Sequence, residues 1–302
     1  MIIKVLDKKY SPIGFLENFK MCEYKRNHST CSEFLLKMDG ASDLLKVHNV
    51  LVINGHYGII EQLTIEMDED GVHTEVRGRG LLSLLSRRIV PAKWSYTGTV
   101  EQAIHALVSG NLRGLNFDTS GVLEGNVSTD EGTFTADLGV TVMDAIEGMA
   151  ARDRMGYEER IVNGVPTLYA VRGTLRQGVF STENGTLLSR EYDHSITTYK
   201  NVAYVSNGDQ ESPIVVEVGE GEGDERYEHF VSEGLSTDAT GEAIPEETQR
   251  KRLTAKGKER LSELPVVEAL SCTVNPYGQM VYGVDYDLGD YILVKADRKS
   301  VV

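Results

Sequence analysis

Cysteine is scarce in this chain. Its three cysteines, Cys22, Cys31 and Cys272, are an odd number and too few for a disulfide framework. The small secreted domains that depend on disulfides are therefore excluded, and a reducing compartment is indicated. We expect a protein made and kept in a cytoplasm, or one that leaves it by lysis or assembly.

Long apolar runs are also missing. No stretch approaches the roughly 20 apolar residues that a membrane-spanning helix needs. The opening residues 1–7 lack the apolar core of a secretory signal. We therefore expect no membrane-spanning segment and no signal peptide.

Positive charge is in deficit. The 302 residues carry 31 Lys and Arg against 46 Asp and Glu, a net charge of −15. Such a chain repels the phosphates of duplex nucleic acid, so specific DNA binding is not expected, and the ordinary role of this acidity is solubility. A 40% hydrophobic share is enough to form a core, and the length indicates two domains or three small ones.

Sequence motifs for catalysis and cofactor binding are lacking too. The chain has no nucleophile elbow and no paired-histidine zinc motif. Gly78-Arg79-Gly80 begins a phosphate-binding pattern, but Ser83 occupies its last glycine position and no parallel βαβ setting follows. The soft-ligand types Cys22, His28 and Cys31 match no common zinc spacing. We predict no catalytic residue, no cofactor-binding residue and no metal site.

Two chemical alternatives remain open. Many pairs among the 46 acidic residues are conceivable, so a glycan hydrolase with two carboxylates is not excluded. Five aromatic side chains are candidates for lining a sugar cleft, although aromatics at helix and strand spacing are more often part of a core. These are Trp94, Tyr96, Tyr192, Tyr199 and Tyr204.

Residues 1–80 are typical of antiparallel β-structure. Short alternating stretches are separated by turns, of which Asn54-Gly55 is a strong hairpin signal and Asp68–Gly71 another. Several short strands with tight turns predict a sandwich or a barrel. A short leucine-rich helix is expected over 81–88.

The middle region predicts a compact α+β unit. Thr99 and Gln102 form a capping-box pair at the start of one helix, and Thr141 caps a second. We expect Gly110 and Gly156 to end these helices. Asn163-Gly164 then predicts a hairpin with a type I′ turn.

The last region is organised around a long helix predicted over 246–264, between Pro245 and Pro265. Leu253, Gly257 and Leu261 fall on one face of it. A glycine inside this stripe costs the helix ~1 kcal/mol relative to alanine. We therefore expect Gly257 to allow close approach of the helix to a sheet.

An acidic stretch over 219–247 precedes this helix. It is rich in glycine and glutamate, so most of it is predicted to be a loop, with one strand over 226–231. The glycines of this stretch do not indicate a phosphate-binding loop, because the glutamates between them would repel a phosphate.

Four patterns resemble those of a known family. They are Gly58-Ile59-Ile60 through Gly80-Leu81-Leu82 with the helix to Arg87-Arg88-Ile89-Val90; Val142-Met143-Asp144-Ala145-Ile146 through Asn163-Gly164; Tyr199-Lys200-Asn201-Val202; and the basic helix followed by Tyr286-Asp287-Leu288-Gly289-Asp290. The chain resembles phage tail-tip (baseplate) hub proteins, in particular the hub-like tail proteins of siphophages and prophages. The resemblance implies an α+β, β-rich fold with two barrel-like antiparallel β domains, over 1–95 and 190–302, and a middle α+β domain over 96–189. The acidic insert at 219–247 has no counterpart in the family.

The resemblance also implies a structural, non-enzymatic role at the tip of a virion tail. Copies of the chain, three in the family pattern, would close a ring joining the tail tube to fibres or a spike. Partners would be the tube or distal tail protein, the tape measure and the fibres, while DNA passes without specific binding. Acidic residues lining the opening would keep that DNA from adhering.

Three other functions stay open at this stage: a cell-wall glycan hydrolase, a carbohydrate- or receptor-binding module, and a distal tail connector with six-fold symmetry. No lysin domain follows Val302, so the resemblance does not extend to the cell-wall cutting of some relatives.

Overall fold

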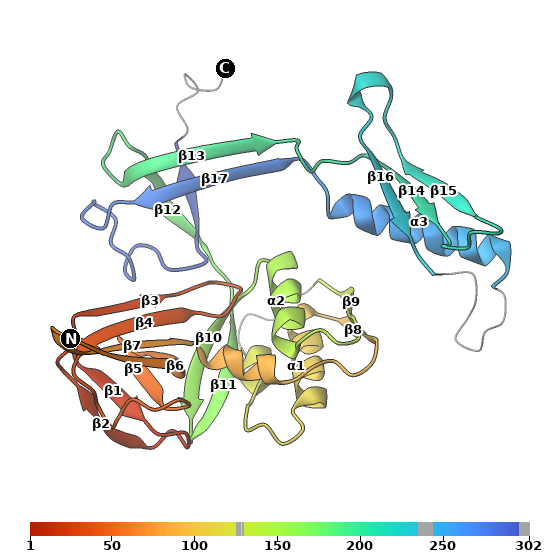
Figure 1. Ribbon diagram of the computed structural model, residues 1–302. Helices are drawn as coiled ribbons and strands as arrows, with labels where there is room; N and C mark the ends of the chain where they lie inside the picture. The colour runs from red at the N-terminus through yellow and green to blue at the C-terminus, as the bar shows by residue number, and fades with distance from the viewer. Residues whose placement is uncertain (125–127, 129, 235–243, 296–302) are drawn as a thin grey trace. The chain divides into compact units, whose positions relative to one another are not determined.

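The computed structural model describes residues 1–124, 128, 130–234 and 244–295. Contacts divide the chain into two compact units. Unit 1 comprises residues 1–179 and 280–294, and unit 2 comprises 180–279 and 295–302. Figure 1 labels the elements of both units.

Unit 1 contains a seven-stranded antiparallel sheet. Its strand order is β2-β1-β5-β6-β7-β4-β3, so β2 and β3 are its two edges. The strands are β1 (Ile3–Leu6), β2 (Pro12–Leu16), β3 (Met21–Lys25), β4 (Glu33–Asp39), β5 (Val50–Ile53), β6 (His56–Asp68) and β7 (Gly71–Arg79). Because it has two free edges, this sheet is not a closed barrel within the described residues.

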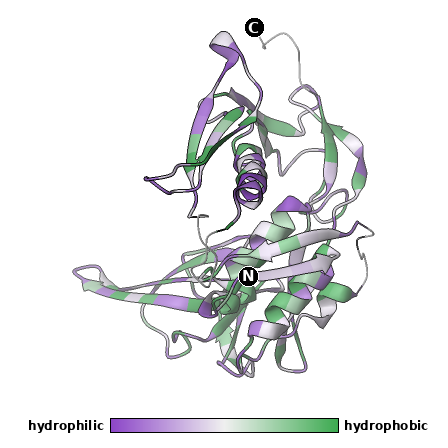
Figure 2. Cartoon of the chain, turned by 90° about the vertical axis from the view of Figure 1, so that its right-hand side faces the viewer, coloured by the Kyte–Doolittle hydropathy of each residue, from purple (hydrophilic) through white to green (hydrophobic). Residues whose placement is uncertain are grey.

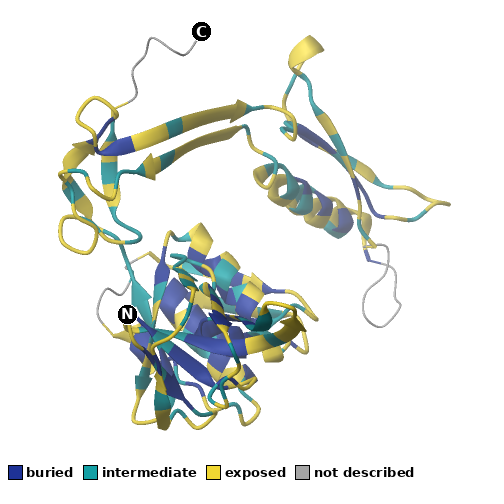
Figure 3. Cartoon of the chain, turned by 60° about the vertical axis from the view of Figure 1, so that its left-hand side comes forward, coloured by how far each residue is buried: buried dark blue, intermediate teal, exposed yellow. Residues whose placement is uncertain are grey.

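Local sequence explains how these strands form. In β4 the buried side chains Phe34, Leu36 and Met38 alternate with outward-facing ones. The predicted turn at Asn54-Gly55 is confirmed, since both residues have positive φ, 49° and 85°. The buried side of the sheet holds its own apolar cluster, visible as dark blue strands in Figure 3.

Helices and short strands complete unit 1. The helices are η1 (Leu81–Arg87), α1 (Val100–Asn111), η2 (Ser120–Leu123) and α2 (Val142–Arg152). The strand pairs are β8 (Trp94–Gly98) with β9 (Gly132–Ala136), β10 (Gly156–Val162) with β11 (Val165–Val171), and β12 (Leu175–Phe180) with β18 (Tyr291–Val294).

The predicted helix starts are confirmed, and the predicted stops are wrong. Thr99 forms a capping box with Gln102, and the Thr141 hydroxyl accepts from the N–H of Asp144. However, Gly110 lies inside the last turn of α1, and the left-handed backbone comes later, at Arg113 (φ 44°) and Gly114 (φ 80°). Gly156 opens β10 instead of ending α2. A glycine thus marks a helix end only where its φ is positive.

The three expected domains, over 1–95, 96–189 and 190–302, stay a prediction, beside the two units into which contacts divide the chain. In unit 1, one apolar cluster joins Leu6 and Val50 of the sheet to Leu107 of α1 and Ile146 of α2, in addition to the cluster of the sheet itself. Residues 280–294 return to unit 1, where Asp290 accepts a hydrogen bond from Arg176 at 2.6 Å.

Unit 2 is β-rich, with one long helix. A three-stranded sheet has β14 (Val202–Ser206) at its centre, antiparallel to β15 (Val215–Gly219) and parallel to β16 (Glu228–Ser232). Beyond it are a two-stranded ribbon, β13 (Leu187–Ser195) with β17 (Val267–Val274), the short η3 (Gly223–Glu225) and α3 (Glu246–Ser262). The expected strand in the acidic stretch is confirmed as β16, whereas its residues 235–243 lie outside the described residues. The described strands of unit 2 form separate small sheets, so a closed second barrel is not observed among them.

Helix α3 lies against the three-stranded sheet through very few side chains. Gln249, Leu253 and Gly257 are its buried residues, and Figure 2, which looks down the helix axis, shows its largely hydrophilic surface. A Cβ on Gly257 would stand 2.7 Å from Val218 Cγ2 and 3.0 Å from Val205 Cγ2. The expected close approach of Gly257 to a sheet is therefore confirmed.

Candidate functional site

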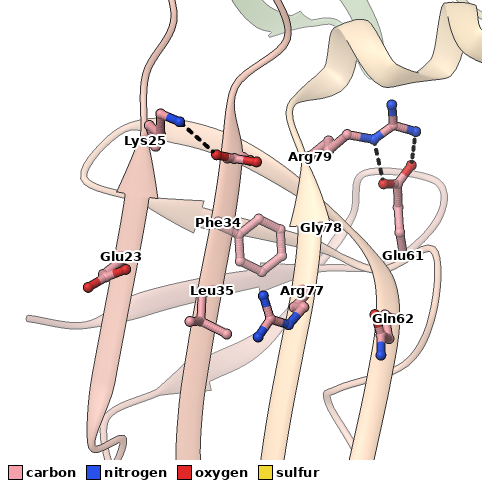
Figure 4. A pocket seen from close by; sticks show the side chains of 10 residues that line it. Glu23, Lys25, Phe34, Leu35, Glu61, Gln62, Arg77, Gly78 and Arg79 are labelled. Atoms are coloured by element: carbon pink, nitrogen blue, oxygen red, sulfur yellow. Dashed lines mark hydrogen bonds and ion pairs between the residues drawn. The ribbon is translucent and has the colours of Figure 1, made fainter.

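A hollow of unit 1 lies on the sheet over β3, β4, β7 and β6 (Figure 4). One of its lining residues, Phe34, packs over two glycines. A Cβ on Gly58 or on Gly78 would collide with the ring of Phe34, which packs over both. Phe34 is only 4% exposed, so its ring fills the space above the glycines and does not offer a free face for stacking.

The charged side chains around this hollow neutralise one another. Arg79 donates from Nε and Nη2 to the two carboxylate oxygens of Glu61, at 2.7 and 3.0 Å. Lys25 donates to Glu33 at 3.1 Å, and Figure 4 shows both pairs. Since both oxygens of Glu61 are already bound, the hollow has no carboxylate pair free for acid–base chemistry.

The carboxyl groups with raised pKa values are half-buried and bind backbone N–H groups. Glu159 of β10 accepts hydrogen bonds from the backbone N–H groups of Leu81 and Leu82, at 2.7 and 2.8 Å. Burial raises its pKa to about 7, and these two N–H donors act in the opposite direction. Burial also raises the pKa of Glu147, which accepts from the N–H of Cys31 at 2.6 Å. Both groups thus bind backbone N–H groups.

The soft-ligand residues do not converge. Cys22 lies on the edge strand β3, and burial raises the pKa of the Cys31 thiol to about 12. The His28 ring is packed against the backbones of Gly156 and Gly289. Among the described residues, no three His, Cys, Asp or Glu side chains are grouped so that they could hold a metal ion.

The aromatic candidates are dispersed as well. Trp94 and Tyr96 stack on each other and pack against the core of unit 1. Tyr199 lies beside Tyr227 in a hollow of unit 2, while Tyr192 is exposed on β13. Within unit 2, Tyr192 of β13 and Tyr204 of the three-stranded sheet belong to different sheets.

The hollow of unit 2 is acidic at its rim and held by Arg226. This guanidinium donates to Glu228 at 2.6 Å, to Glu217 at 2.8 Å and to the Tyr204 hydroxyl at 2.6 Å. Asn201 closes the loop from the other side, accepting from the N–H of Tyr227 and donating to the carbonyl of Glu225. These hydrogen bonds fix the loop between β15 and β16, so the polar side chains around this hollow stabilise unit 2.

The exposed apolar residues of β2 and of the β13–β17 ribbon were missed by sequence reasoning. Phe15, Tyr192 and Leu270 are 61%, 51% and 45% exposed. Their residue types predict strands, but they do not reveal which face of a strand stays uncovered. Surfaces of this kind suit association with other proteins.

Comparison with known proteins identifies the family. The sequence model of the siphovirus ReqiPepy6 Gp37-like protein family matches residues 2–302. The chain belongs to this family. It is thus a member of a phage tail protein family, as the sequence patterns predicted. Comparison with curated proteins finds no match.

Solved structures with a similar fold are tail proteins. A prophage MuSo2 43 kDa tail protein from Shewanella oneidensis is similar over 99% of this chain and 89% of its own, at 11% identity and a TM-score of 0.54. A tail protein from Neisseria meningitidis MC58 is similar over 99% of this chain and 87% of its own, at 15% identity and a TM-score of 0.52. This member of the family therefore has the fold of phage tail proteins. No helix among its described residues is long and apolar enough to cross a membrane.

Proposed function

We propose that this chain is a structural hub of a phage or prophage tail tip. Three copies close a ring that joins the tail tube, or a distal tail protein, to the tape measure and to fibres or a spike. The single observation that carries the proposal is family membership over residues 2–302, supported by similarity to tail proteins over 99% of the chain.

In this proposal the sheets supply the wall of the ring. The seven-stranded sheet of unit 1 and the small sheets of unit 2 are the barrel-like parts, and closure takes place on assembly. The support is that β2 and β3 are the two ends of the larger sheet, which is therefore open in the described residues of a single copy.

The proposed role is mechanical and not enzymatic. Its support is that Glu147 and Glu159, the carboxyls with clearly raised pKa values, already accept hydrogen bonds from backbone N–H groups. A glycan hydrolase needs such a carboxyl at a cleft. Release of sugar from cell walls by the purified chain, lost in Glu159→Gln, would establish the enzyme instead.

The net charge of −15 has a role in the same proposal. Acidic side chains around the opening repel the phosphates of passing DNA and prevent it from adhering. A basic lumen in the assembled ring would contradict this part of the proposal.

Gold-labelled antibodies against the chain, applied to purified tails, test where it lies. We expect label at the distal tip, and image averaging should show a three-fold ring there. A six-fold ring would identify a distal tail connector, and label along the fibres alone would favour a receptor-binding module.

A further inference from the structure

The two edges of the seven-stranded sheet differ in what they offer to another strand. Edge strand β3 carries Glu23 and Lys25, and charges on an edge oppose the addition of a strand. Edge strand β2 has the sequence Pro-Ile-Gly-Phe-Leu, without a charge. Its Ile13 and Phe15 are 42% and 61% exposed, so β2 presents an apolar side-chain surface. Pro12 and the register shift opposite it disfavour backbone pairing at the start of this strand, so the contact is expected through side chains.

This apolar surface continues onto β1. Phe15 pairs with Lys4, and Ile2, two residues before Lys4, is 60% exposed. Because side chains two residues apart share a face of a strand, the exposed Ile2, Ile13 and Phe15 form one surface. We call this surface the β2 edge. It lacks a covering element among the described residues of its unit.

A second exposed surface is the β13–β17 ribbon. Figure 3 shows it almost wholly exposed, and the exposed residues fall on both of its faces. Tyr192 stands opposite Leu270 on one face, and Leu188 is 61% exposed. A two-stranded ribbon without a core is marginally stable in water, so a covering surface would stabilise it.

The charges of the two surfaces are complementary. The hairpin over residues 1–16 has Lys4, Lys8 and Lys9 against Asp7, which gives 3 − 1 = +2. The ribbon has one basic residue and three acidic ones, which gives 1 − 3 = −2; they are Arg190, Glu191, Asp193 and Glu268. Copies with a net charge of −15 repel each other, and a basic surface meeting an acidic one offsets that repulsion and sets the orientation.

We propose that the β2 edge of one copy binds the β13–β17 ribbon of a second copy. Tyr192 and Leu270 of the ribbon cover Ile13 and Phe15, and the acidic ribbon faces Lys8 and Lys9. The contact is head-to-tail, so each copy keeps one free edge and one free ribbon, and repetition closes a ring. This inference rests on the proposed ring and names the surface that builds it.

Complementary variants of the full-length chain test the contact. Phe15→Lys disrupts the β2 edge and leaves the ribbon intact. Tyr192→Lys disrupts the ribbon and leaves the β2 edge intact. We expect each variant alone to self-associate roughly tenfold or more weakly than the original chain in sedimentation at high concentration. Mixed together, the two variants should form one-to-one dimers, in which the intact β2 edge of Tyr192→Lys binds the intact ribbon of Phe15→Lys. These dimers should grow no further, because the remaining edge and the remaining ribbon are both disrupted.

Glu23→Gln is the matched control, since it changes the net charge by the same +1 on the other edge of the same sheet and should leave association unchanged. Circular dichroism of every variant reports folding. If the original chain associates and Phe15→Lys does not weaken it, or if the mixture yields no dimer, this inference is overturned while the ring remains. If the original chain stays monomeric at high concentration, direct contact between copies is overturned, and the antibody experiment on purified tails decides the tail-tip role separately.

Discussion

Units 1 and 2 differ in how they obtain stability. In unit 1, α1, α2 and η1 share one large apolar core with the sheet. In unit 2, the buried cluster under α3 consists of Ala203, Val205, Val231 and Leu253. Unit 1 has a core of ordinary size, whereas unit 2 depends on a few contacts and, in our proposal, on a neighbouring copy.

Ion pairs should show the largest contrast between the units. Arg172 donates to Glu101 at 3.0 and 3.2 Å, and the Glu101 side chain is fully buried in the first turn of α1. Arg172→Ala leaves that carboxylate without its cation, so unit 1 should lose about 3–5 kcal/mol of unfolding free energy. In unit 2, Lys251 pairs with Glu247 in solvent, and Lys251→Ala should cost about 0.5 kcal/mol or less. Urea unfolding of both variants provides the measurement; equal effects would contradict the contrast.

Removing a buried leucine should reveal the thin core of unit 2. Leu253 of α3 and Leu107 of α1 are both fully buried, so each change to alanine should cost about 2–5 kcal/mol. We expect Leu253→Ala to release α3 and expose the amides of β14 to hydrogen exchange while unit 1 stays protected. Leu107→Ala is the matched control, with faster exchange confined to unit 1. Faster exchange throughout the chain in both variants would mean that the units unfold together.

The dependence of stability on pH should belong to unit 1. The pKa of Glu159 is raised from 4.5 to about 7 by burial in the folded chain. The folded state therefore binds this proton more tightly, and the resulting stability is present below pH 4.5 and is lost as the pH rises through 7. The difference amounts to up to about 3 kcal/mol. In Glu159→Gln the stability of unit 1 should vary less between pH 5 and 8, roughly the range that the shift spans. An unchanged pH profile in thermal melts would show that Glu159 does not titrate there.

The sequence predicted the features of the fold that short segments determine. The capping box at Thr99, the turns at Asn54-Gly55 and Asn163-Gly164, and the glycine at position 257 each depend on a few neighbouring residues or on one helix face. Arg172 and Glu101 pair although they lie 71 positions apart in the sequence, so no short sequence pattern predicts their contact. The expected stop at Gly110 was wrong because its backbone stays helical.

Domain division and the candidate surfaces were harder to predict for a similar reason. The sequence shows a change from strands to helices near residue 95, but it does not show that Leu6 and Val50 of the sheet join the apolar cluster of the helices. The alternation in β2 predicts a strand, yet the exposure of Phe15 depends on which element covers that face in the folded chain. Family patterns compensated for part of this gap, because they predicted the tail protein family before any contact was known.

A pair of glycine substitutions offers the smallest and most sharply controlled test. In α3, Gly257→Ala places a Cβ 2.7 Å from Val218 Cγ2, which should force the helix away from the sheet and cost unit 2 about 1–3 kcal/mol. In α2, Gly148 is exposed and its Cβ would meet open space, so Gly148→Ala should stabilise unit 1 by roughly 0.5–1 kcal/mol.

Helix propensity favours alanine equally at both sites, so the opposite signs isolate the effect of packing. Thermal melts followed by hydrogen exchange assign each change to its unit. If Gly257→Ala also stabilised the chain, α3 would have room to move at no cost. The close approach of α3 to β14 and β15 would then not be what selects glycine at this position.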